Sequence, residues 1–123
     1  MLYTTYISNI KNLSEDMQKK VIIIARYFKS EKFKKDIRLC PSAGLLKDRK
    51  DGLDWYDFEY FFKKEMKEQP MLGALRELYK RLKHGEDIIL ACYEKDDSIC
   101  HRRLIGEFLS QYGIEYKEIE GVM

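Results

Sequence analysis

The chain lacks the features that mark membrane and secreted proteins. Its longest uninterrupted apolar run covers residues 21–25, whereas a membrane-spanning helix needs about 20 apolar residues. Residues 1–20 show neither the basic start nor the long apolar stretch of a secretory signal. There are only three cysteines, and no two of them form a CxxC pair. This odd count argues against a disulfide framework and favours a reducing, cytoplasmic location.

An excess of charge of one sign is also lacking. The 23 Lys and Arg residues nearly balance the 21 Asp and Glu residues, and the formal net charge of +2 is too small to argue by itself for a polyanionic partner. Hydrophobic residues make up 45% of the chain and charged residues 36%, a balance that favours one core beneath a polar surface. No repeat or linker interrupts the sequence, so we expect a single domain over residues 1–123.

Strand-like and helix-like segments alternate along the chain. The expected strands cover residues 2–7, 21–25, 87–92 and 114–119. The expected helices cover residues 14–19, 42–50, 55–68, 71–83 and 100–112. Residues 26–39 carry six basic residues and no clean period, so we expect an irregular connection there. The two central strands are continuously apolar, as in a parallel sheet, and the last strand alternates, as at an edge. The pattern predicts an α/β fold: a single three-layer α/β sandwich with a mostly parallel sheet of about four strands.

Reactive side chains follow the carboxyl ends of these expected strands, where parallel α/β proteins bind their ligands. Cys92 ends one strand, and Cys100 and His101 open the helix after it, with Asp97 or Ser98 as the expected N-cap. The free N–H groups of that first helical turn favour an anion. We therefore expect one edge of the sheet, at the carboxyl ends of its strands, to carry Ser8, Asn9, Arg26, Cys92, Glu94, Cys100, His101 and Arg102.

Each of these residues also has a purely structural interpretation. Cys92 and Cys100 border apolar segments and are equally explained as core residues. His101 can simply hydrogen-bond a strand end. The basic run of residues 29–38 is either a solvated face or a phosphate-contacting patch. The aromatic residues of the helix at 55–68 mostly cover the sheet, although one or two can line a cleft and stack on a planar ligand.

Cysteine and histidine are also zinc ligands, but their spacing argues against a metal site. Cys100 and His101 are sequence neighbours, and neighbours on a helix point about 100° apart. Cys40 would be the fourth ligand and lies far away in the sequence. We therefore expect no metal and no cofactor.

The segment "LACYEKDDSICHRRLIGEFL" resembles the signature of the domain-of-unknown-function-488 family. Members carry a strand, then Cys-x-Glu-Lys/Arg, a short acidic turn, and Cys-His-Arg opening a helix. The matching residues are Cys92, Glu94, Lys95, Cys100, His101 and Arg102. Ser8 and Asn9 resemble the family's Ser-Asn turn, and Ser42 lies in a Pro-Ser stretch that resembles a short-form branch. Arg26 is kept after the second strand, but the acidic residue that often precedes it is missing.

The resemblance implies the α/β fold and a cytosolic setting, and it draws attention to these residues without supplying a substrate. Two functions stay open: an enzyme acting on an anionic small molecule such as a nucleotide, or a non-catalytic nucleotide or nucleic-acid binding module with structural cysteines. In the enzyme, Cys92, Glu94, Cys100 and His101 are the expected catalytic residues. Under either function, the expected ligand contacts are Ser8, Asn9, Arg26, Ser42 and Arg102. No membrane partner is expected.

Overall fold

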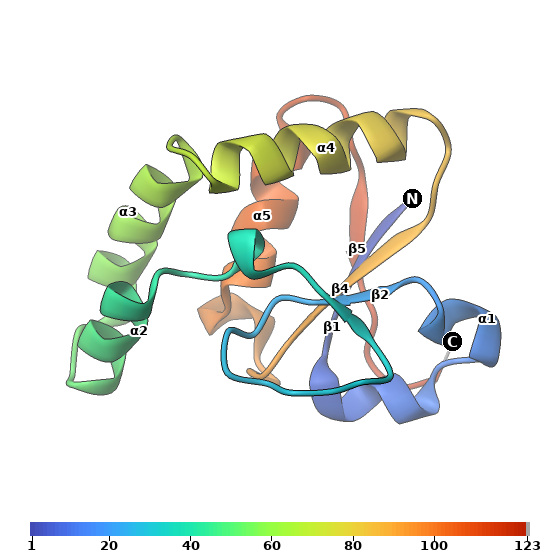
Figure 1. Cartoon of the computed structure of the whole chain (residues 1–123), viewed down its shortest axis with the longest axis horizontal. Helices are drawn as coiled ribbons and strands as arrows, with labels where there is room; N and C mark the ends of the chain where they lie inside the picture. The colour runs from blue at the N-terminus through green and yellow to red at the C-terminus, as the bar shows by residue number, and fades with distance from the viewer. Residues whose placement is uncertain (123) are drawn as a thin grey trace.

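The computed structural model describes residues 1–122 and contains a five-stranded parallel sheet (Figure 1). Its strands are β1 (Leu2–Tyr6), β2 (Val21–Ile23), β3 (Lys34–Lys35), β4 (Ile88–Cys92) and β5 (Tyr116–Glu118). They lie in the order β3-β2-β4-β1-β5, and every pair is parallel. The α/β fold is confirmed, as is the edge position of the last strand. The extra strand is β3, whose two exposed lysines carry no strand pattern that a sequence could reveal.

Five α-helices and three 3₁₀ helices connect these strands. The α-helices are α1 (Glu15–Gln18), α2 (Ala43–Lys50), α3 (Trp55–Met66), α4 (Met71–Lys83) and α5 (His101–Ser110). The 3₁₀ helices are η1 (Ile7–Asn12), η2 (Ile37–Leu39) and η3 (Asp97–Ile99). None of the helices within residues 1–122 has the length and apolar character needed to cross a membrane.

The sheet buries both of its faces, which accounts for the continuously apolar central strands. In β4, Ile88, Leu90 and Cys92 face the core shared with α2 to α5. Ile89 and Ala91 face a second, smaller core beside η1 and α1. Because successive strand residues point to opposite faces, Cys92 necessarily points toward the larger helices.

Local capping sets several helix starts as predicted, but not that of α5. Ser14 and Asp54 accept N-terminal hydrogen bonds from Met17 and Asp57. Before α5, however, residues 97–99 form η3, which Asp96 caps. Cys100 is then the extended residue before α5, with φ −131°, ψ 141° and no side-chain cap. The predicted cap at Asp97 or Ser98 was therefore wrong, because one short turn of 3₁₀ helix uses these residues.

Candidate functional site

The cleft beside Cys92 forms where β2 and β4 end next to each other. The Ile24 N–H donates to the Ala91 carbonyl at 2.9 Å, and this bond keeps the segment after β2 beside β4. Arg26 then follows β2, and Cys92 ends β4. Both line one cleft of about 170 Å³, together with Glu94, Cys100 and His101. Two distant segments of the sequence thus deliver an arginine and two thiols to one opening.

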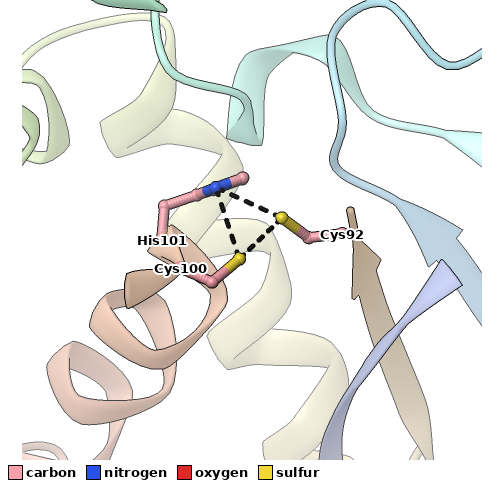
Figure 2. A group of neighbouring side chains, drawn as sticks. All are labelled: Cys92, Cys100 and His101. Atoms are coloured by element: carbon pink, nitrogen blue, oxygen red, sulfur yellow. Dashed lines mark hydrogen bonds between the residues drawn. The ribbon is translucent and has the colours of Figure 1, made fainter. Parts of the chain in front are cut away.

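Cys92, Cys100 and His101 point toward one another and form a compact cluster (Figure 2), and all three line this cleft. The Cys92 and Cys100 sulfur atoms lie 2.6 Å apart. The Nδ1 atom of His101 lies 3.5 Å from the Cys92 sulfur and 3.9 Å from the Cys100 sulfur. All three residues are buried, so few water molecules compete for these atoms.

The backbone fixes which nitrogen of His101 carries a proton. Nε2 lies 2.8 Å from the carbonyl oxygen of Ile24. A carbonyl can only accept, so Nε2 must donate its hydrogen there. In the neutral ring, Nδ1 is then an unprotonated acceptor that faces both sulfur atoms. The Phe62 ring packs edge-on against the imidazole, with centroids 5.4 Å apart, and helps to hold this orientation.

The two thiols of the cluster have pKa values displaced in opposite directions. A hydrogen bond from the Cys100 thiol lowers the pKa of Cys92, assisted by the backbone amides of Glu94 and Tyr93 and by the charge of Arg102, although burial opposes the shift. Burial raises the pKa of Cys100, and so does its contact with Cys92. The arrangement therefore favours a Cys92 thiolate that accepts a hydrogen from Cys100.

Arg102 does not line the cleft but supports its rim from behind. Its side chain is fully buried and donates to the Glu118 carboxylate through Nε at 3.0 Å and through Nη2 at 2.9 Å. It also donates to the carbonyl oxygens of Glu94 and Lys95, which fixes the loop after β4. Arg102, which we predicted to contact the ligand, is thus already engaged in an internal ion pair with Glu118.

Three other predicted site residues also lie away from the cleft. Ser8 is exposed on η1, while Asn9 is buried and donates to Thr5 and to the carbonyls of Ile119 and Gly121. The chain turns away from the cleft after β1, because η1 packs on the opposite face of the sheet. Ser42 caps α2, and its hydroxyl and N–H both donate to Glu65. Asn9 and Ser42 thus have structural partners that a sequence motif could not reveal.

The cleft includes contacts that sequence reasoning missed. Arg26 is half-buried, and its Nε donates to the Pro41 carbonyl at 2.9 Å. Arg49 joins it from α2 and lies over the Trp55 ring, 6.0 Å from the ring centroid. The remaining aromatic wall consists of Tyr27, Phe58 and Tyr93. Arg49 gave no signal, because it resembles any basic residue on a solvated helix, whereas Tyr93 was identifiable from its position directly after Cys92.

The cluster also brings together three potential metal ligands. One atom each from Cys92, Cys100 and His101 lies within 4.8 Å of the others. The divergence expected of helix neighbours does not occur, because Cys100 is extended and precedes the helix. Two sulfurs and an imidazole nitrogen are ligand types that zinc accepts. Cys40 is not part of this group; it instead contacts the Asp36 carbonyl at 3.6 Å.

Comparisons with known proteins identify the family. The family model described as "Active DUF488-N3 subclade" matches residues 5–113, a range that contains the whole cluster. No curated protein and no solved structure matched the chain. The match covers most of the sequence, so the chain belongs to the domain-of-unknown-function-488 family, within this subclade.

Proposed function

We propose that this protein is an enzyme that binds an anionic small molecule, with a nucleotide as the best-suited class, and attacks it with the Cys92 sulfur. One observation carries the proposal: Arg26 and Cys92 line the same cleft at the strand ends. An arginine offers two-pronged donors to phosphate or carboxylate, and a thiolate is a strong nucleophile. Glu94 and His101 lie on the same cleft and are the groups available to move protons.

The size of the cleft limits which part of the ligand enters it. About 170 Å³ is below the roughly 300–1,000 Å³ of pockets that enclose a whole drug-sized ligand. A reactive group fits beside Cys92, while the rest of the ligand lies along the opening. Tyr27 and Tyr93 are more than half exposed there, and a base ring could stack on them.

Burial of the cysteines favours a second function, a binding module without chemistry. Cys92 and Cys100 are 4% and 1% exposed, as core residues are. In such a module the arginines alone would hold the ligand, and the sulfur atoms would only pack. The two functions differ in what the loss of Cys92 does.

Titration calorimetry with AMP tests the proposal. The wild type is compared with the Arg26→Ala, Cys92→Ser and Arg76→Ala variants. We expect Arg26→Ala to weaken binding about 10- to 100-fold, as loss of charge-assisted hydrogen bonds does. Arg76→Ala, an exposed arginine on α4 outside this cleft, should bind like the wild type. Cys92→Ser should keep binding and lose turnover. Unchanged binding by Arg26→Ala would contradict the proposal. A wild-type protein that binds the nucleotide but whose Cys92 does not react with an alkylating reagent would indicate the binding module.

A further inference from the structure

We propose that Cys100 is the resolving thiol of the site, so that turnover ends in a Cys92–Cys100 disulfide and the substrate leaves reduced by two electrons. The inference rests on the proposed function, because it needs Cys92 as the attacking group. It adds a second reacting residue, a direction of electron flow and a narrower substrate class.

The separation of the two sulfur atoms is the first support. They lie 2.6 Å apart. The sulfurs of a disulfide lie about 2.05 Å apart. The two sulfur atoms are thus in direct contact, so a local movement of the two side chains brings them to the bonded distance.

His101 supplies the proton acceptor that the second thiol needs. Its Nδ1 atom carries a lone pair, because Nε2 donates to the Ile24 carbonyl. Nδ1 lies 3.9 Å from the Cys100 sulfur, within reach after a small rotation of the thiol. Cys100 can thus lose its proton inside a buried site, without access to bulk water.

The two thiols differ in their surroundings. Burial raises the pKa of Cys100 most, and the hydrogen bond to Cys92 and the charge of Cys92 raise it further. Once Cys92 has formed a covalent bond, the contribution of its charge is gone, while burial still raises the Cys100 pKa. The proton of Cys100 therefore has to pass to a nearby acceptor, and the geometry supplies His101 Nδ1 for this step.

The reaction balances in two steps. The Cys92 thiolate attacks atom X of a substrate X–Y, so that the S–X bond forms and Y leaves with the X–Y electron pair. The Cys100 thiol then gives its proton to His101 Nδ1 and attacks the Cys92 sulfur. The S–S bond forms, the S–X bond breaks, and X leaves with that electron pair and takes the proton from His101. Two thiols have become one disulfide, and an external dithiol restores them.

This sequence restricts the chemistry of X. The Cys92–X bond must break with the electron pair on X, which a carbon–sulfur thioether does not allow. X is therefore a heteroatom, most simply the sulfur of a disulfide. The cleft arginines add that the molecule is an anion, and the exposed tyrosines suit an aromatic one. We infer a substrate class of anionic compounds with an electrophilic sulfur; a nucleotide belongs to this class only when it carries such a sulfur, so unmodified AMP would bind without reacting.

An anionic aromatic disulfide, bis(3-carboxy-4-nitrophenyl) disulfide, is a direct probe, because each released thionitrobenzoate absorbs visible light. Native, reduced protein is mixed with the probe and a chelator, and released and protein-bound thionitrobenzoate are counted. We expect the wild type to release two equivalents, retain none, and lose two hydrogens in mass, with peptides of Cys92 and Cys100 cross-linked. The Cys100→Ser variant should release one equivalent and hold the other on Cys92. Cys40→Ala should behave as the wild type.

The outcomes separate the two proposals. Wild-type protein that keeps thionitrobenzoate on Cys92 would overturn the resolving role of Cys100 and leave the reactivity of Cys92 intact. A disulfide that includes Cys40 would overturn it as well. No reaction at Cys92 in the native protein would overturn both proposals. Serine in place of Cys100 nearly preserves its volume and is a favourable N-cap residue, and peptide mapping of the wild type gives an answer that does not depend on the variant.

Discussion

At the scale of single residues, the three cysteines show how the surroundings decide reactivity. Cys40 is buried and lies near Arg26, yet burial raises its pKa to about 11. Cys92 is equally buried, but the Cys100 thiol and two backbone amides donate toward its sulfur and lower its pKa. Burial alone makes a thiol less reactive, whereas directed hydrogen-bond donors and a nearby positive charge oppose that effect.

Arg102 and Glu118 make the residue-scale prediction about stability. The Arg102 side chain is fully buried and that of Glu118 is 13% exposed. Loss of either partner therefore leaves an unpaired charge in the core. We expect Glu118→Ala to lower the free energy of unfolding by about 3–5 kcal/mol, measured by urea denaturation. The exposed Lys47–Asp51 pair is the matched control, and Asp51→Ala should cost less than about 0.5 kcal/mol. Equal costs for the two variants would show that Arg102 is not held as the structure indicates.

At the scale of elements, α5 must lie close to β5 for the start of α5 to reach the cleft. Gly106 permits this approach, because a Cβ atom there would meet the Tyr116 ring at 2.7 Å. We expect Gly106→Ala to destabilise the protein by about 1–3 kcal/mol, measured by thermal unfolding. Without the contact, the same change in a helix would stabilise by about 1 kcal/mol.

Two variants check that explanation. Gly44→Ala, on α2 with no atom within 4 Å of the added group, should be neutral or stabilising. Tyr116→Leu should recover part of the loss in the double variant, because the two residues then couple through one contact. A Gly106→Ala protein as stable as the wild type would mean that α5 can shift away from β5 at no cost.

How far the sequence predicts these elements depends on how local their causes are. The apolar stripe of α4 and the Asp54 cap of α3 are local, and both elements lie where they were predicted. The start of α5 depends on η3, a turn of two polar residues and one apolar residue that Asp96 caps and that shows no helical period in the sequence. β3 depends on pairing with β2 across a long connection, and two lysines cannot signal that.

At the scale of the whole molecule, the strand order explains which predicted residues meet. β2 and β4 are neighbours, so Arg26 and Cys92 arrive at one cleft. β1 is also a neighbour of β4, but the chain after β1 packs on the opposite face, and Ser8 and Asn9 stay away. Parallel topology predicted the shared edge, whereas the face on which each connection packs depends on contacts that no local pattern contains.

The most direct test of whether Arg26 and Cys92 share one cleft is to alkylate Cys92 in the presence and absence of an anionic ligand. Iodoacetamide is added to native protein at pH 7, with or without AMP, and each cysteine is followed by mass spectrometry. We predict that Cys92 reacts more than about tenfold faster than Cys40, because its lowered pKa leaves more thiolate at this pH. AMP should slow the reaction of Cys92 in the wild type and have no effect in Arg26→Ala. Equal protection in both proteins, or a Cys92 as slow as Cys40, would contradict a cleft in which Arg26 presents a ligand to the Cys92 sulfur.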